Sequence, residues 1–126
     1  MSRRDSGKAA EDAAARHLRA SGYKILERNF STPVGEIDIV ALDGEVICFV
    51  EVRSHSVDDF GSALEALTKK KQRKVARAAQ AYLRRRRMEN ARMRFDFAAV
   101  ELASDGSHEV NVIKSAFWPG EIAGGG

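Results

Sequence analysis

The chain has 126 residues and a hydrophobic content of 44%, which is enough to bury one core without disulfides, so a single domain over residues 1–126 is expected. One cysteine excludes an intrachain disulfide, and no apolar stretch approaches the roughly 20 residues of a membrane span, so we expect a cytoplasmic protein without a membrane partner. The net charge is +3, but residues 69–87 carry ten Lys and Arg and no acid, which suits either a phosphate-binding surface or a solvated helix face.

The first half of the sequence predicts one helix followed by three strands. A cap at Asp5 or Ser6 opens a helix whose small and apolar residues recur at three- and four-residue steps as far as Gly22. Residues 31–35 read as a loop, and Asp43-Gly44 is a hairpin signal. The three predicted strands of this half lie at residues 23–30, 36–42 and 45–53.

The second half predicts a basic helix between a polar connection and two further strands. Thr68 can cap this helix, which is expected over 69–89, and the connection before it carries a short helical turn at 63–67. The Gly-rich tail at 120–126 is expected to be disordered. The last two predicted strands lie at 93–102 and 108–114, which gives the order αβββαββ and an ordered core of about 7–118.

The predicted hairpin carries acidic residues that can converge. Because alternate side chains of a strand share a face, Glu36 projects on the same side as Asp38, and Glu51 projects on the same side as Arg53. A two-residue turn at Asp43-Gly44 would set Glu36 opposite Glu51, whereas a four-residue loop over 43–46 would set Asp38 opposite Glu51. Both registers place the carboxylates on one face, and a three-residue loop would separate them.

Converging carboxylates on an apolar hairpin need compensation for their repulsion and burial. Oxygen ligands favour Mg²⁺ or Mn²⁺, and such an ion can activate water and neutralise charge that develops on a phosphate. The spacing therefore fits phosphodiester hydrolysis. It fits equally an edge hairpin whose Glu36, Asp38 and Arg53 are simply solvated.

The runs GEIDIVA, FVEVR, FGSALEALT-x-x-K-x-x-K, RFDFAAV and IKSAF resemble, in this order and over about residues 7–117, the YraN-like family of bacterial proteins. That family is similar to archaeal Holliday-junction resolvases and to the wider restriction-endonuclease-like PD-(D/E)XK superfamily. The resemblance implies an α/β, restriction-endonuclease-like single domain with an αβββαβ core. This chain is expected to add one C-terminal strand, and its mixed sheet is expected to be flanked by helices.

The resemblance also implies a set of site residues. The motif acids correspond to Asp38 and Glu51, which would hold the metal with the Val52 backbone carbonyl, and resolvase-like members add an acid of the first helix, here Glu11. The motif lysine is Arg53 in this chain. Arginine does not give up its proton, so Arg53 can clamp a phosphate and stabilise charge but cannot act as the base.

The start of the basic helix is a second candidate surface. The first turn of this helix carries three positive charges, on Lys69, Lys70 and Lys71, at the positive end of the helix dipole. This placement is unfavourable for the helix alone, and a bound anion would compensate for it. Gln72 lies close to where related nucleases often place a polar residue. These four residues are our predicted nucleic-acid contacts, together with Arg53.

Three functions are compatible with these patterns. The first is a metal-dependent endonuclease on structured or branched DNA, acting as a homodimer as resolvase-like enzymes commonly do. The second is a non-catalytic nucleic-acid-binding domain with a nuclease fold, which the arginine at position 53 makes credible. The third is an assembly protein that uses the same surface for an acidic partner.

Overall fold

The structure, a computed structural model, describes residues 3–118 of the chain and the side chains from Gly7 onward. The tail predicted to be disordered, 120–126, lies outside the described residues. No helix in the described part is long and apolar enough to cross a membrane. The helices are α1 (Arg3–Ala20), α2 (Phe60–Glu65) and α3 (Lys69–Arg85), and the strands are β1 (Lys24–Thr32), β2 (Gly35–Asp43), β3 (Val46–Ser56), β4 (Arg92–Leu102) and β5 (His108–Phe117).

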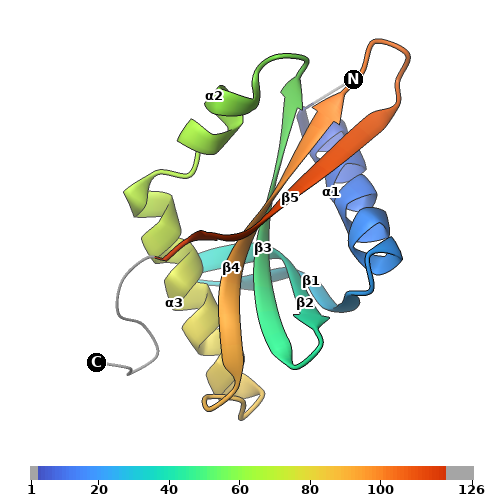
Figure 1. Cartoon of the computed structure of the whole chain (residues 1–126). Coiled ribbons are helices and arrows are strands. Elements are labelled where there is room, and N and C mark those ends of the chain that lie inside the picture. Colours follow the sequence, from blue (N-terminus) through green and yellow to red (C-terminus); the bar gives the residue numbers. More distant parts are fainter. Residues whose placement is uncertain (1–2, 119–126) are drawn as a thin grey trace.

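The strands form one mixed sheet between two helical layers. Its order is β1-β2-β3-β4-β5; the pair β3–β4 is parallel and the other neighbours are antiparallel. The parallel pair is joined by the crossover through α2 and α3, while α1 covers the opposite face (Figure 1). This arrangement confirms the single restriction-endonuclease-like α/β domain predicted from the sequence.

Each long helix buries a small-residue stripe against one face of the sheet. α1 contributes alanines and Leu18, and α3 contributes Val75, Ala79, Tyr82 and Leu83. Apolar strand residues alternate between these two faces, so both sides of the central strands are buried. The α1 face receives Ile39, Ala41, Cys48 and Val50, whereas the α3 face receives Val40, Ile47, Phe49 and Phe95.

The end of a helix was predicted correctly where a glycine follows the helix, and incorrectly where none does. α1 ends in a left-handed Gly22, and the Tyr23 N–H donates to the Leu18 carbonyl over 2.9 Å, as predicted from the glycine. The same motif ends α3, where Met88 N–H donates to a carbonyl of the last turn, but the left-handed residue is Arg87. Without a glycine to mark it, the predicted helix 69–89 ran about one turn too far.

Three other predicted boundaries were also wrong. The predicted loop at 31–35 is a tight turn, because the Thr32 hydroxyl accepts the N–H groups of Val34 and Gly35, which lets β1 and β2 continue to Thr32 and Gly35. The last strand extends to Phe117 through an irregularity at Ser115, whose N–H donates to buried Asp96. The short helix begins at Phe60 instead of 63.

Asp96 is buried at the α1 face and organises a polar network that reaches the surface. Both of its oxygens accept the Arg94 Nε–H over 3.0 Å, and the same guanidinium donates to the Tyr23 hydroxyl and to Asp43. Asp43 also pairs with Lys114 at 3.3 Å. The network ties β2, β4 and β5 together at the end of the sheet opposite the β1–β2 turn.

Candidate functional site

The candidate site forms where β2 and β3 separate. Their backbone pairing runs from Asp43 opposite Val46 to Ile39 opposite Val50 and stops there. Continued in register, it would set Asp38 opposite Glu51, which is the second of the two predicted registers. The turn that produces it is Gly44-Glu45, with Gly44 at a φ of +62°, because Asp43 is still a paired strand residue.

Side-chain hydrogen bonds replace the ladder at this point. The Val52 N–H donates to an Asp38 carboxylate oxygen over 2.8 Å, and the Asp38 N–H donates to a Glu51 carboxylate oxygen over 3.3 Å. In a strand the N–H and C=O of one residue project to the same side, so the Val52 carbonyl also faces β2 here. Two carboxylates and one carbonyl therefore meet between the separated strands.

Both carboxylates are held in an environment that disfavours their charge. Glu51 is only 3% exposed. Burial raises its pKa to about 8, repulsion from Asp38 adds to the rise, and Lys71 opposes it. Burial likewise raises the pKa of Asp38, against the hydrogen bond from Val52, and Glu11 contributes further repulsion. A positive charge between Asp38 and Glu51, in addition to that of Lys71, would stabilise the ionised form of both carboxylates.

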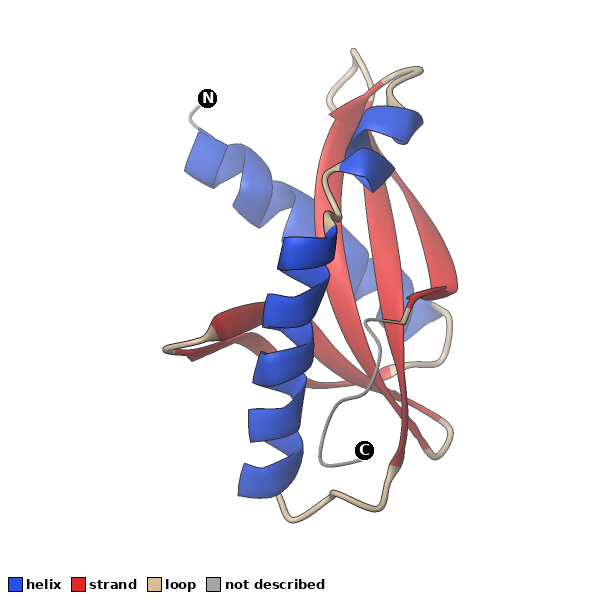
Figure 2. Ribbon diagram, turned by 90° about the vertical axis from the view of Figure 1, so that its left-hand side faces the viewer, coloured by secondary structure: helices blue, strands red, loops and turns tan. Residues whose placement is uncertain are grey.

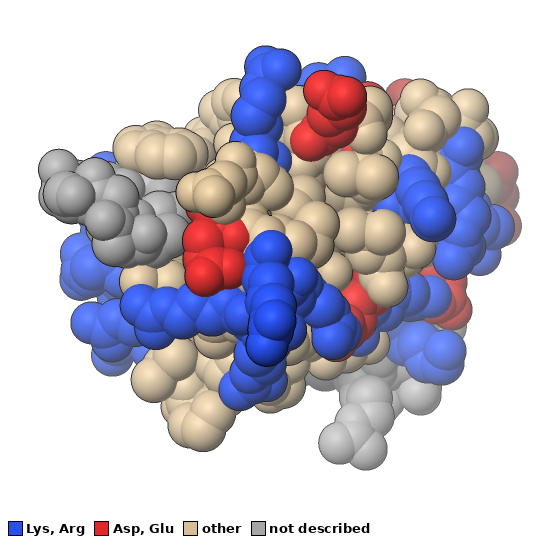
Figure 3. Space-filling view, turned by 90° about the horizontal axis from the view of Figure 1, so that it is seen from below, with Lys and Arg blue, Asp and Glu red and all other residues tan. Residues whose placement is uncertain are grey.

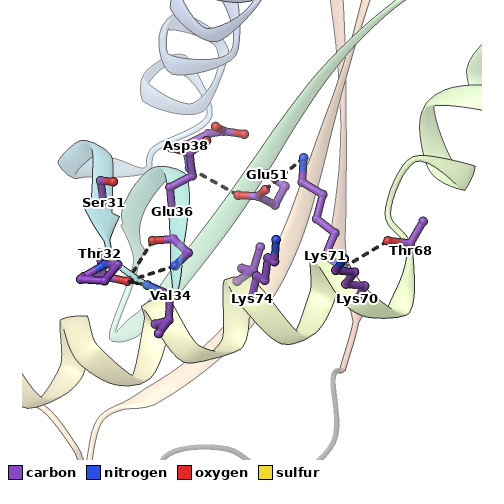
Figure 4. A pocket seen from close by; sticks show the side chains of 13 residues that line it. Ser31, Thr32, Val34, Glu36, Asp38, Glu51, Thr68, Lys70, Lys71 and Lys74 are labelled. Atoms are coloured by element: carbon purple, nitrogen blue, oxygen red, sulfur yellow. Dashed lines mark hydrogen bonds and ion pairs between the residues drawn. The ribbon is translucent and has the colours of Figure 1, made fainter.

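The carboxylates lie in a cleft of about 590 Å³ between the β1–β2 turn and the start of α3 (Figure 4). One wall is the turn itself, from Ser31 to Glu36. The opposite wall carries Lys70, Lys71 and Lys74. The Lys71 ammonium points across the cleft and lies 4.0 Å from a Glu51 oxygen. The cleft thus combines an acidic floor with a basic wall.

Local interactions explain this wall of α3. The Thr68 hydroxyl accepts the Lys71 N–H over 3.1 Å and caps the helix as predicted, which fixes the direction in which its first turn starts. Residues three and four apart share a helix face, so Lys70, Lys71 and Lys74 lie together. The opposite wall is close because Gly35 touches the Lys74 backbone, where any Cβ would overlap the Lys74 carbonyl oxygen.

The other predicted contacts on α3 and β3 lie outside this cleft lining. Lys69 is exposed beside it. The Gln72 amide donates to the Leu67 carbonyl over 2.9 Å and so fastens the connection before the helix. Arg53 lies two residues beyond Glu51 on β3, on the same face of the sheet, and is partly buried.

Glu11 lies on the α1 side of the same region. Its carboxylate accepts the Arg28 guanidinium over 3.1 and 3.2 Å and the Asn29 amide over 3.0 Å. Asn29 reaches it from a left-handed backbone conformation with φ of 55°. Glu11 is therefore close enough to raise the pKa of Asp38, and the hydrogen bonds from Arg28 and Asn29 all go to one of its oxygens, Oε1.

The arginines at the other end of α3 are engaged by the protein. Arg86 pairs with Glu27 and lies over the Tyr82 ring, and Arg85 lies over the Phe30 ring. Seen from below, Lys and Arg side chains cover much of the surface and acidic side chains are few (Figure 3). The basic surface thus extends beyond the cleft, but in this part it also serves packing.

The donor set can be compared with the needs of a divalent cation. No group of three or more His, Cys, Asp and Glu side chains within the described residues forms a complete metal site. Mg²⁺, however, is usually bound by one or two carboxylates and keeps several waters. Asp38, Glu51 and the Val52 carbonyl meet that requirement, and a cation there would offset the burial and the repulsion that raise the pKa of both carboxyls.

Some cleft residues were missed in the sequence. Lys74 could have been found from its spacing to Lys70 and Lys71 on one helix face. Thr32 and Gly35 carried no such signal, because they reach the site only through the long-range contact of the β1–β2 turn with α3.

Comparison with known proteins identifies the family. The profile described as "Uncharacterised protein family UPF0102" matches residues 10–100. A UPF0102 protein of Hahella chejuensis is 46% identical over 101 residues, which are 80% of this chain and 82% of the relative. One of Desulfosudis oleivorans is 44% identical over 115 residues, 91% of each chain. One of Symbiobacterium thermophilum is 46% identical over 117 residues, 93% of this chain and 98% of the relative. The YraN-like resemblance is thereby confirmed, and the chain belongs to the bacterial family UPF0102.

Proposed function

We propose that this protein is a metal-dependent endonuclease that hydrolyses phosphodiester bonds in structured or branched DNA. One observation carries the proposal: Asp38 and Glu51 hydrogen-bond across the point where β2 and β3 separate, on the floor of a cleft walled by lysines. Buried like charges are costly unless something compensates them. A divalent cation and a phosphate would compensate both sides of this cleft.

The roles follow from the positions of the residues. Asp38, Glu51 and the Val52 carbonyl would hold Mg²⁺ or Mn²⁺. The chemistry available at such a site would be activation of a water and neutralisation of charge on the phosphate. Because the pKa of Glu51 is raised to about 8, binding of the cation at neutral pH is accompanied by release of a proton from the acidic pair.

The lysines position the substrate. A phosphate held by Lys71 lies next to Glu51, since the ammonium is 4.0 Å from that carboxylate. Lys70 and Lys74 line the same wall and bind neighbouring phosphates of the strand. Arg53, which replaces the motif lysine, binds backbone phosphate past the cleft and takes no proton.

Cleavage of end-labelled branched DNA with Mg²⁺ or Mn²⁺ tests the proposal. Asp38→Asn and Glu51→Gln should each lower the rate by roughly 100-fold or more, because losing a ligand weakens the metal site at least as much as losing an outer partner does. Glu45→Gln, the same change at an exposed position of the β2–β3 turn, should cleave as the wild type does. Equal residual cleavage in all four proteins would mean a contaminant and would end the nuclease proposal.

A second candidate, a non-catalytic nucleic-acid-binding domain, is favoured by Arg53. Arginine cannot take over the role of the motif lysine as a base, so cleavage could be lost. DNA binding needs only the fold and the basic wall, which would remain. This candidate requires binding that falls steeply with salt and survives Asp38→Asn, with no metal-dependent product. Calorimetric titration with Mn²⁺ separates the two further, because binding that disappears in Asp38→Asn supports the metal site and hence the enzyme.

A further inference from the structure

The turn between β1 and β2 projects as an arm. In Figure 2 the two strands extend past α3 and end in a tight turn on the left of the molecule. Pro33 and Val34 form its tip; both are exposed, Val34 to 47%. An apolar pair thus lies at the outermost point of an arm whose neighbouring wall is basic.

Two sets of contacts make this tip stiff. The Thr32 hydroxyl accepts the N–H groups of Val34 and Gly35 over 3.2 Å and donates to the Gly35 carbonyl over 3.0 Å. Proline restricts the backbone of the turn itself. Behind the tip, the Gly35 backbone lies directly on the Lys74 backbone of α3. The arm therefore cannot fold toward the cleft or away from it without breaking these contacts.

The tip lies at the entrance of the same cleft that holds the carboxylates. Pro33 and Val34 line it together with Asp38 and Glu51. Asp38 follows Val34 by four residue steps, which in an extended strand span at most about 13 Å. Val57 is a useful contrast, because it is exposed to 56% but lies in the β3–α2 connection, outside the cleft lining. Val34 therefore differs from Val57 by its position at the cleft entrance, because both side chains are exposed.

We propose that the β1–β2 tip is a wedge that opens the last base pair at a junction of duplex and single-stranded DNA. Proteins that bend or open nucleic acids insert apolar side chains, proline among them, between base steps while cationic side chains hold the backbone. Here the tip supplies the apolar element and Lys70, Lys71 and Lys74 supply the cations. The opened strand enters the cleft between them. The substrate class is therefore a fork or flap.

The position of the cut follows from the same distance. At about 3.4 Å per nucleotide along a stacked strand, 13 Å corresponds to about four nucleotides. The cut is expected in the single-stranded arm, at most about four nucleotides from the junction. This part rests on the proposed nuclease activity, whereas the wedge itself requires only binding.

The experiment uses forked DNA with 2-aminopurine in the last base pair before the fork, in EDTA so that no cleavage occurs. The fluorescence of this base rises when it is unstacked. Wild-type protein and Val57→Ser should produce the rise. Val34→Ser should bind the fork within about threefold of the wild-type affinity, since phosphate contacts supply most of it, but should lose most of the rise. Val34→Leu, which keeps an apolar side chain at the tip, should give the fluorescence rise of the wild type.

The outcomes separate the wedge from the nuclease. An equal rise in wild type and Val34→Ser, or wild-type binding without any rise, overturns the wedge. A Val34-dependent rise without metal-dependent cleavage supports the wedge and counts against the nuclease. Cleavage with Mn²⁺ that is as fast in blunt duplex as in the fork supports the nuclease and overturns the inferred substrate class. Absence of DNA binding overturns both.

Discussion

Replacing Glu51 with glutamine should make the protein more stable at alkaline pH relative to the wild type. In the folded protein the pKa of Glu51 is raised from 4.5 to about 8, chiefly by burial, so between these values the folded state keeps a proton that the unfolded chain has released. Wild-type stability therefore falls as pH rises through this range. Glutamine cannot ionise and is not subject to this loss.

The magnitude follows from the size of the shift. Each pKa unit corresponds to about 1.4 kcal/mol, so the displacement amounts to a few kcal/mol at most, and about 2 kcal/mol once solvent entering the cleft is allowed for. At roughly 4 °C per kcal/mol for a chain of this size, the wild type should lose about 8 °C of melting temperature relative to Glu51→Gln between pH 5 and pH 9. The Lys71 contact needs an ionised Glu51, so its effect is already part of the shifted pKa, and the glutamine oxygen can still accept the Asp38 N–H.

Thermal melts of both proteins from pH 5 to pH 9, without divalent cations, measure this difference in slope. Glu45→Gln provides the control, because its carboxylate is exposed in the β2–β3 turn. Addition of Mg²⁺ at ten times its dissociation constant should then stabilise the wild type at pH 8 by about 1.4 kcal/mol and leave Glu51→Gln unchanged. Parallel pH profiles for wild type and Glu51→Gln would refute the inference that burial of this carboxyl outweighs the charge of Lys71 and raises its pKa.

Two further substitutions test the cleft. Gly35→Ala should destabilise the protein by about 1–3 kcal/mol, because the new methyl group must displace the Lys74 backbone, whereas Gly61→Ala, with open space around its Cβ and a helical position, should be neutral or stabilising in the same denaturant titration. Lys70→Gln should lower the slope of log affinity for DNA against log salt by about 0.9, the contribution of one phosphate contact, and the exposed Lys24→Gln on β1 should leave it unchanged. Equal slopes for the two lysine variants would remove Lys70 from the binding surface.

The carboxylate pair illustrates what local sequence could predict. The hairpin signal at residues 43 and 44 and the two-residue period of the strands place Asp38 and Glu51 on one face when the connecting loop has two or four residues, but not when it has three. They left two registers open. In the structure Asp43 is still a strand residue, opposite Val46, and its carboxylate binds Arg94 and Lys114 of distant strands.

The sequence by itself determined the order of the elements, the cap at Thr68 and the glycine end of α1, because each depends on backbone preferences and neighbours within a few residues. Only the tertiary structure decided how the cleft is made. Its two walls meet where Gly35 lies on Lys74, 39 residues away along the chain, and Arg28 holds Glu11 across the first helix and strand. Such contacts depend on how whole elements pack, and no local pattern encodes them.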